Sequence, residues 1–390
     1  MFKKMPFILI FAIVLVAIFE RYIPENWLSI FFALSLSIKS LIIFLLPPVI
    51  FMLLFKTTAA LSNKATKIIL FLLAGICASN FLSTMISYIV GNGIYQLDLS
   101  IAPPSSTDGL KAAWDFSLPK LIGNDVAMFS GLILGISLSL IKPNLAEVIS
   151  SQFDRWIQST LKFILCLIPP FLIGFMMKMI HDKVIESIIY DYALIFLLVA
   201  AAQYGYIFTL YLIANKFNFS NFINSIKNMT PAAIAGFGSM SSAAALPLTL
   251  IGAEKNTNQS PLARLVIPTT VNIHLIGDCF AIPIFAFAVM KSFHFADPTF
   301  TSYLLFAFYF VIAKFSVAAI PGGGILVMLP ILESQLGFTG EMSSLITALY
   351  ILFDPIITSA NVSGNGAFAM IVEKISTLQI FNKSYMIKKS

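Results

Sequence analysis

Charged residues are scarce in this sequence. Only 11% of the 390 residues are Asp, Glu, Lys or Arg, whereas an ordinary soluble domain has about 25%. Hydrophobic residues make up 58% of the chain, and the mean hydropathy is +0.92. Many apolar runs reach the roughly 20 residues that a helix needs to cross a bilayer. The composition excludes an ordinary soluble domain and predicts an all-α integral membrane protein, with the lipid bilayer as a partner.

The patterns of known catalytic and metal sites are also missing. The sequence has no Gly-x-Ser-x-Gly, Walker or His-Glu-x-x-His motif, and its three cysteines lie in apolar runs without metal-ligand spacing. We therefore expect neither an enzyme nor a cofactor, and the identity of any bound metal ion stays unknown. The net charge of +6 does not indicate a nucleic-acid partner, because the basic residues lie at the ends of apolar runs.

Apolar runs predict the first six spans, at 5–19, 28–55, 68–91, 126–141, 160–180 and 190–215. The first run resembles a signal peptide, but no small-residue cleavage site follows it, which favours a retained span. The polar stretch 92–125, with its Pro-Pro-Ser-Ser run, predicts a mobile outer loop. A second polar segment, 142–156, follows the fourth span.

Basic residues concentrate in every second loop, which orients the chain. This positive-inside pattern predicts that both termini are cytoplasmic. The residues concerned are Lys3, Lys4, Lys56, Lys64, Lys67, Lys142, Arg155, Lys216, Lys227, Lys374, Lys383, Lys388 and Lys389.

The regular pattern breaks after residue 229. The segments 236–250 and 316–330 are apolar enough for a membrane but are interrupted by Gly, Ser and Pro. Irregular backbone at membrane depth is tolerated only inside protein or beside a cavity. Such paired, broken segments are typical of a transporter binding site with internal repeats. The alternative is two ordinary spans with glycine kinks.

Four polar residues in the last long apolar segment share one stripe. At about 100° per residue, Asp354, Thr358, Asn361 and Asn365 fall within about 60° of arc on a helix. An ionisable stripe in a span indicates a functional site that faces a cavity or a partner. The alternative is a packing seam of small and polar residues, which seldom needs an aspartate.

These segments resemble the dicarboxylate/amino acid:cation symporter family, which has the glutamate-transporter fold. SMSSAAALP resembles the tip of the family's first re-entrant hairpin, and AAIPGGG resembles the tip of the second. DPIITSANVSGN resembles the binding stripe of the eighth span. Weaker matches, LPPVIFMLLF and LIPPFLIGFM, extend the resemblance over nearly the full length.

The resemblance implies eight transmembrane helices and two re-entrant hairpins in a homotrimer of the bacterial-type inner membrane. A transport domain would slide against a scaffold in an elevator motion, with the second hairpin as outer gate. The implied boundaries are scaffold spans one and two in 1–65, span three of the transport domain in 66–91, an outer loop with scaffold spans four and five in 92–185, the rest of the transport domain in 186–375, and a basic cytoplasmic tail in 376–390.

The family's motifs also imply roles for individual residues. Asp354 corresponds to the aspartate that accepts hydrogen bonds from the substrate amino group. Thr358 and Asn361 match positions that bind the substrate carboxylate, assisted by Ser241 and Ser242 of the first hairpin. Gly322 and Gly323 belong to the second hairpin tip beside the substrate.

Departures from the family pattern favour a neutral substrate. Members that carry acidic substrates have an arginine where this sequence has Ile357 or Met240. Without a guanidinium, a second substrate carboxylate has no bidentate partner. We therefore expect a small neutral amino acid or a related organic acid.

The cation sites depart further. The family's seventh-span motif Asn-Met-Asp-Gly-Thr aligns with 274–278, so His274 and Ile276 replace its asparagine and aspartate, and Asn365 replaces a sodium carboxylate of span eight. Hard cations prefer carboxylate and carbonyl oxygens. The polar ligands of the third span are also missing from 67–79. We therefore expect altered coupling, with sodium or a proton as the candidate ion.

Four residues are candidates for coupling besides Asn365. His274 and Asp278 are four apart and would share one helix face, where His274 could load a proton; the alternative is a structural histidine satisfied by Asp278. Lys314 could act as a tethered cation or a proton carrier; the alternative is a lysine that snorkels to the outer interface. Asn272, two residues before His274, is the fourth.

The function expected is a secondary-active symporter that imports a small molecule. One alternative is an uncoupled facilitator, exchanger or anion-conducting member of the same fold, which the altered sodium ligands favour. A coupled carrier concentrates its substrate under an ion gradient, whereas a facilitator only equilibrates it. The second alternative is a non-transporting sensor, against which the retained residues Asp354, Thr358 and Asn361 argue.

Overall fold

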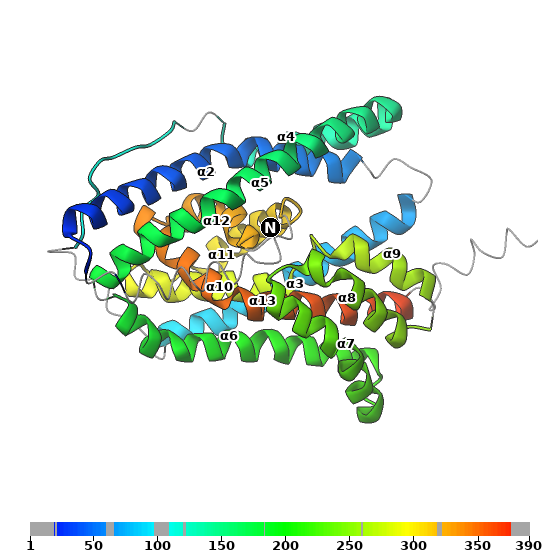
Figure 1. Cartoon of the computed structure of the whole chain (residues 1–390). Coiled ribbons are helices and arrows are strands. Elements are labelled where there is room, and N and C mark those ends of the chain that lie inside the picture. The colour runs from blue at the N-terminus through cyan, green and yellow to red at the C-terminus, as the bar shows by residue number, and fades with distance from the viewer. Residues whose placement is uncertain are drawn as a thin grey trace, which may run out of the picture.

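The computed structural model describes residues 19, 22–59, 66–96, 109–119, 122–182, 184–258, 260–317 and 322–375, and these residues contain helices but no strand. Most of the helices run roughly along one axis of the molecule (Figure 1). They are α2 (Glu25–Ala59), α3 (Thr66–Gln96), α4 (Asn124–Ile141), α5 (Pro143–His181), α6 (Val184–Ala214), α7 (Phe219–Ser239), α8 (Ser242–Asn256), α9 (Ser260–Thr270), α10 (Ile276–Ser292), α11 (Phe300–Lys314), α12 (Gly323–Leu336) and α13 (Gly340–Ile375).

The predicted spans agree with these helices wherever the structure describes them. Helices α2 to α6 cover the predicted second to sixth spans. Residues 143–156 of the polar segment are helical as well, and Pro143 starts α5 at the first helical position, where a missing N–H costs nothing. The predicted first span, apart from Phe19, and the basic tail 376–390 lie outside the described residues.

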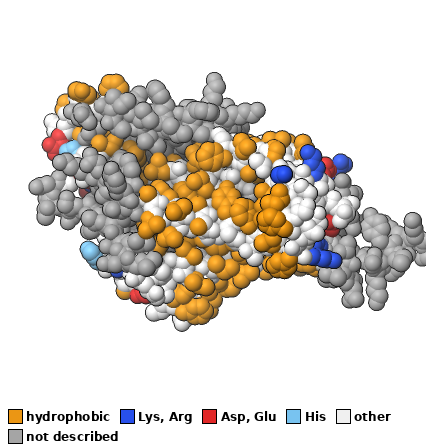
Figure 2. All heavy atoms as spheres, turned by 90° about the horizontal axis from the view of Figure 1, so that it is seen from below, with side chains coloured by type: hydrophobic (Ala, Val, Ile, Leu, Met, Phe, Trp, Pro, Cys, Tyr) orange, Lys and Arg blue, Asp and Glu red, His pale blue; other side chains and the backbone are white. Residues whose placement is uncertain are grey.

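Three helical stretches of the described chain are long and apolar enough to cross a membrane. They are Leu70–Gln96, Tyr192–Ala214 and Gly340–Ile375. Figure 2 shows hydrophobic side chains over the middle of one face, with lysine and arginine side chains gathered toward one end. This distribution is typical of a surface that meets lipid in its middle and water at its ends.

Helices α2, α4 and α5 form one group, the α2 group, which lies along the upper side of Figure 1. Glycines let their backbones come close: a Cβ atom on Gly131 of α4 would lie 2.6 Å from the Phe51 carbonyl oxygen of α2. A Cβ atom on Gly135 or Gly174 would also collide with the backbone of α2. Small residues at such positions allow close helix packing in lipid.

The described part of the predicted outer loop, 109–119, lies along the α2 group. The indole N–H of Trp114 donates to Ser37 Oγ of α2 at 3.0 Å, and the Leu118 N–H donates to Ser40 Oγ at 2.7 Å. The Leu110 N–H donates to Asp182, at the end of α5, at 2.9 Å. These bonds fix this segment to α2 and α5, whereas 97–108 lies outside the described residues.

The remaining helices, α3 and α6 to α13, form a second group around α13, the α13 group. Most of α13 is buried, and it packs against α6, α7, α8, α9, α10 and α12. The two groups meet where α2 lies against α12 and α5 against α6. Lys39 of α2 also reaches across, since its Nζ donates to the Gly340 carbonyl oxygen at 2.8 Å and to Ser344 Oγ at 3.3 Å.

The two segments predicted to be irregular are breaks between helices. Helices α7 and α8 pack on each other and are separated by Met240 and Ser241, where Met240 adopts a left-handed conformation with φ of 50°. The second break follows α11 at Lys314 and ends at Gly322, which has φ of 71° and directly precedes α12. Residues 318–321 between them lie outside the described residues.

A third break lies between α9 and α10, which follow the first hairpin formed by α7 and α8. Helix α9 ends at Thr270 and α10 begins at Ile276, so 271–275 are not helical. Asn80 of α3 holds this break: its Nδ2 donates to the Ile273 carbonyl oxygen at 2.7 Å, and its Oδ1 accepts the Leu275 N–H at 3.2 Å. One side chain thus satisfies two backbone groups that the missing helix turn leaves open.

Candidate functional site

The polar stripe predicted on 354–365 lies on α13 and faces the interior. Asp354, Thr358, Asn361 and Asn365 are each at most 4% exposed. The stripe is therefore buried inside the protein, which both a functional site and a packing seam require, and its role as a functional site stays a prediction. Buried polar groups need hydrogen-bond partners, and these partners come from α3, α10 and the two breaks.

Asp354 connects α13 to the second hairpin. Its Oδ2 accepts the Gly322 N–H at 2.9 Å, and its Oδ1 accepts the Thr358 hydroxyl at 3.0 Å. Gly322 is the residue before α12, and backbone N–H groups at a helix start favour a negative charge. Among the described residues, no lysine or arginine forms an ion pair with Asp354. The carboxylate is therefore buried with neutral donors only.

Asp278, in the first turn of α10, lies at the centre of a second set of contacts. Its Oδ1 accepts the Tyr350 hydroxyl at 2.5 Å, and its Oδ2 accepts Nδ2 of Asn361 at 3.3 Å. Asn361 in turn accepts the Gly277 N–H at 2.8 Å through its Oδ1. Two side chains of α13 thus hold the start of α10.

Tyr350 was not among the predicted site residues. It lies four residues before Asp354 and therefore on the same helix face, so the spacing could have revealed it. Its hydroxyl is buried against Asp278, which makes it part of the site.

Glycines allow α12, the second arm of the second hairpin, to pack closely against Asp278 and Tyr350. A Cβ atom on Gly324 would lie 2.5 Å from Asp278 Oδ1 and would also collide with the Tyr350 hydroxyl. A Cβ atom on Gly277 would collide with the Ile357 carbonyl oxygen. Gly323 is buried between Gly322 and Gly324. The glycine-rich tip is therefore needed for the close approach of α12 to Asp278.

His274 lies in the break before α10 and is fully buried. Its Nδ1 is 2.8 Å from Asn365 Oδ1, its Nε2 is 2.9 Å from Ser79 Oγ, and its ring lies against Phe368. The prediction that His274 and Asp278 share one helix face is wrong, because α10 begins only at Ile276. The alternative of a histidine satisfied by Asp278 is also wrong, since Asn365 and Ser79 fill that role.

Lys314, the last residue of α11, has no exposed surface. Its Nζ is 3.8 Å from Asp278 Oδ2 and 4.5 Å from the ring centroid of Phe310. The alternative of a lysine that snorkels to the outer interface is therefore wrong. The side chain turns inward, toward the carboxylate on α10.

Helix α3 carries more polar residues than expected. The expectation that the third span lacks polar ligands considered only 67–79. The buried polar residues begin directly after this stretch. The next two turns bury a set of polar side chains, which are Asn80, Ser83, Thr84 and Ser87. Their spacing of three and four residues in the sequence indicates one helix face and could have revealed them.

The first hairpin passes beside the stripe. A Cβ atom on Gly236 of α7 would lie 3.1 Å from Val362 Cγ2 and 3.3 Å from the Thr358 carbonyl oxygen. At its tip, Met240 and Ser242 are buried, and Ser241 caps α8 by accepting the Ala244 N–H. The tip is therefore a packed turn rather than an exposed loop.

Ile357 and Asn272 are predicted site residues that do not join the polar contacts of this cluster. Ile357 is fully buried and has an apolar side chain. Asn272, in the turn after α9, is exposed. The structure thus brings together most of the predicted residues but leaves Asn272 outside the cluster.

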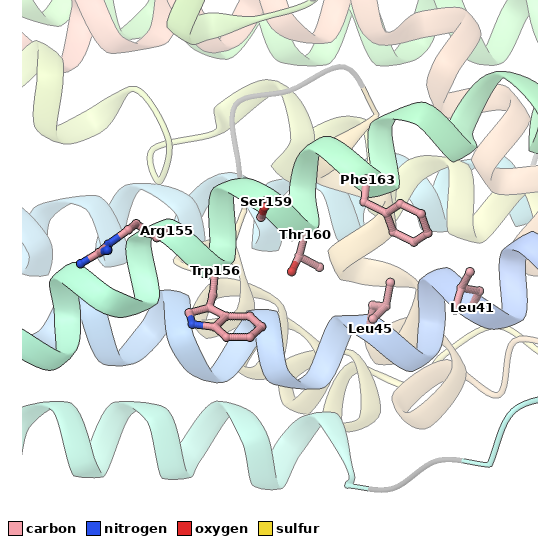
Figure 3. Close-up of a pocket in the computed structure, with 7 residues that line it drawn as sticks. All are labelled: Leu41, Leu45, Arg155, Trp156, Ser159, Thr160 and Phe163. Atoms are coloured by element: carbon pink, nitrogen blue, oxygen red, sulfur yellow. The ribbon is translucent and has the colours of Figure 1, made fainter.

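A separate hollow of about 510 Å³ lies on the α2 group. It is lined by Leu41, Leu45, Arg155, Trp156, Ser159, Thr160 and Phe163, all on α2 or α5 (Figure 3). None of the stripe or hairpin residues lines it. Its walls are mostly apolar and offer no carboxylate to a substrate amino group.

A family model matches most of the chain. The model of the sodium:dicarboxylate symporter family matches residues 5–375, which include both hairpins, the broken helix and the stripe. A comparison with curated proteins gives no match.

Proposed function

Because the chain belongs to the sodium:dicarboxylate symporter family, we propose that it is a secondary-active carrier that imports a small amino acid or a related organic acid. The family consists of cation-coupled membrane transporters, so the chain is an integral membrane protein that moves a small molecule. The identity of that molecule has to be inferred from the site itself.

The observation that carries the proposal is the buried Asp354 carboxylate. Its two oxygens contact only neutral donors, the Gly322 N–H and the Thr358 hydroxyl. A buried carboxylate is stabilised best by a cationic partner. The ammonium group of an amino acid is such a partner. When it binds, it would replace the Gly322 N–H of the second hairpin as a donor to Asp354.

A neutral substrate side chain fits this site better than an acidic one. Ile357 and Met240, at the positions where a guanidinium would hold a second carboxylate, are both buried and apolar. Burying a charged side-chain carboxylate beside them would leave it without a partner. We therefore infer that the substrate carries one ammonium and one carboxylate and no further charge. Thr358, Asn361, Ser241 and Ser242 are the proposed carboxylate ligands.

The proposed mechanism is an elevator motion within a homotrimer. The α2 group would form the scaffold, and the α13 group would move against it with the second hairpin as outer gate. The dense glycine packing within the α2 group supports this division, because it makes α2, α4 and α5 a body of their own. We place the chain in a bacterial-type inner membrane with both termini cytoplasmic.

The proposed coupling ion is a proton instead of sodium. His274 is held between Asn365 and Ser79, where an uncharged Asn365 replaces the family carboxylate. An imidazole is the side chain whose charge changes most readily near neutral pH. The competing proposal, an uncoupled facilitator, rests on the same replacement of carboxylates.

Flux measurements in proteoliposomes test the proposal. Vesicles with purified protein would receive labelled neutral and acidic amino acids under an inward sodium gradient, an inward proton gradient, or neither. Accumulation of a neutral amino acid above its outside concentration, under the proton gradient only, is expected. Equilibration without accumulation would favour the facilitator. Failure to move any amino acid or dicarboxylate, together with no ligand-induced thermal stabilisation, would overturn the carrier proposal in favour of a sensor.

A further inference from the structure

A lysine ammonium group is enclosed in the core of the α13 group. Lys314 is fully buried, and its Nζ lies 3.8 Å from Asp278 Oδ2 and over the ring of Phe310. This Nζ makes no hydrogen bond in the part of the chain that the structure describes. Burial without partners is costly for a charged amine, so the nearby carboxylate is what compensates it.

The buried Asp278 carboxylate in turn depends on the charge of Lys314. The other contacts of its carboxylate, from the Tyr350 hydroxyl and the Asn361 amide, come from uncharged donors. A buried ion pair persists when both charges are present, whereas one charge alone is strongly destabilising. Lys314 is therefore the cation that the described residues offer to Asp278.

The pair lies where the second hairpin meets α10 and α13. Lys314 ends the first arm of this hairpin, α11, and Gly324 of the second arm, α12, approaches Asp278 closely. Gly322 of the same arm donates to Asp354 of α13. Both arms of the hairpin are thus held by buried carboxylates of the neighbouring helices.

A sodium ion does not fit beside Asp278. A hard cation requires several oxygen ligands and a site with excess negative charge. Here the ammonium group of Lys314 already neutralises the carboxylate, and it would repel a second cation. Within the described residues, no group of three His, Cys, Asp or Glu side chains could hold a metal ion. These residues therefore disagree with the sodium that the family name implies.

We propose that Lys314 is a built-in cation that holds the second hairpin against α10 and α13, so that sodium is not needed there. The positive charge at this joint belongs to the chain and does not have to be bound from solution. This inference rests on the proposed carrier function for its uptake measurement only. The stability measurements below do not require any transport.

The first experiment compares thermal unfolding of the purified full chain in sodium chloride and in choline chloride at equal ionic strength. Because the cation site is filled by Lys314, the two unfolding midpoints are expected to be equal. Uptake of the neutral amino acid found in the flux screen is expected to proceed at the same rate in both salts. A higher midpoint or faster uptake in sodium chloride would overturn the proposal.

The second experiment is a double-mutant cycle made of Lys314→Met, Asp278→Asn and the double variant. Lys314→Met removes the ammonium, leaves Asp278 unpaired, and is expected to lower the unfolding midpoint. The double variant K314M/D278N has no buried charge at the joint and is expected to recover most of that loss. The absence of recovery would show that Lys314 acts by packing alone and would overturn the proposal.

Lys39→Met is the matched control, because Lys39 is also buried but bonds to neutral oxygens of Gly340 and Ser344. Its loss of stability is expected to be unaffected by D278N. If Lys314→Met yields no folded protein, the comparison of unfolding midpoints in the two salts, made on the unaltered chain, still tests the proposal. If no uptake is found for any substrate while the cycle gives recovery, the carrier function fails and the built-in cation stands.

Discussion

At the scale of single residues, the site contains two buried carboxylates, and we assign them different roles. Asp354 contacts the tip of the second hairpin through Gly322, and Asp278 contacts Lys314 from the end of α11. Among the described residues, only Asp278 of these two carboxylates forms an ion pair with a lysine or arginine. The carboxylate without a cation is the one that we assign to the substrate, and the other to the architecture.

Asp354→Asn tests this division. We expect the variant to lose amino-acid binding by about 2–5 kcal/mol, because removing one partner of a buried charge pair leaves the other unpaired. Ligand-induced thermal stabilisation and uptake would both measure the loss. Glu341→Gln is the control: Glu341 is an exposed residue in the first turn of the same helix, and the variant is expected to bind normally. Equal binding by the two variants would contradict the assignment.

His274 carries the proposed proton coupling. His274→Ala removes the imidazole between Asn365 and Ser79, and we expect the pH dependence of uptake to disappear. Uptake at a series of pH values would measure this. His294→Asn is the control, because His294 is exposed and its left-handed φ of 57° suits asparagine. Retention of the wild-type pH profile by His274→Ala would exclude this residue as the proton carrier.

At the scale of secondary-structure elements, the first two breaks could be predicted and the third could not. Gly, Ser and Pro interrupt 236–250 and 316–330, and the chain breaks inside both segments. The break at 271–275 contains neither Gly nor Pro. It depends on Asn80, nearly two hundred residues earlier in the chain, which no local pattern can reveal. This is why His274 and Asp278 were expected on one helix.

Asn80→Ala tests how much the third break depends on α3. The variant leaves the Leu275 N–H and the Ile273 carbonyl oxygen without their partner in a buried place, at a cost of about 1–3 kcal/mol for each group. We expect a clearly lower thermal midpoint. Ser83→Ala, one turn further along α3, should have little effect, because the Ser83 hydroxyl donates to carbonyl oxygens of its own helix. Similar losses in both variants would contradict the role of Asn80.

Glycine substitutions test the packing of the α2 group. In Gly135→Ala the new methyl group would collide with Thr58 and with the Phe55 carbonyl oxygen, and such overpacking costs about 1–3 kcal/mol. In Gly205→Ala of α6 it would meet no atom within 4 Å, and alanine should stabilise the helix by up to about 1 kcal/mol. The two variants should therefore shift the thermal midpoint in opposite directions. A shift of the same sign would contradict the close contact of α4 with α2.

At the scale of the whole molecule, the sequence predicted the membrane class and the breaks inside 236–250 and 316–330. It could do so because composition and glycine placement are local properties of the chain. The partners of Lys314 and His274 come from three different helices, so their contacts required the fold. The same is true of the division into an α2 group and an α13 group, because it follows from which helices share close backbone contacts.

In the described part of the chain, Lys39 links these two groups by polar contacts. Lys39 is 9% exposed, and its ammonium group donates to the Gly340 carbonyl oxygen and to Ser344 Oγ at the start of α13. If the α13 group slides against the α2 group during transport, these bonds must break in each cycle. Bonds to a charged group contribute about 1.5–3 kcal/mol, so their loss should shift the equilibrium between the two positions by about tenfold to a hundredfold.

Lys39→Met removes this link while it keeps most of the side-chain volume. We expect the variant to spend more time in the other position, which distances between spin labels on α2 and α13 would detect as a second, more populated distance. Ser37→Ala is the control: Ser37 also lies on α2, but its hydroxyl bonds to Trp114 and to its own helix, within the α2 group. A distance distribution that is identical in Lys39→Met and Ser37→Ala would mean that the groups do not slide at this contact. In an elevator motion, the two groups would then have to slide against each other at the contact of α5 with α6 instead.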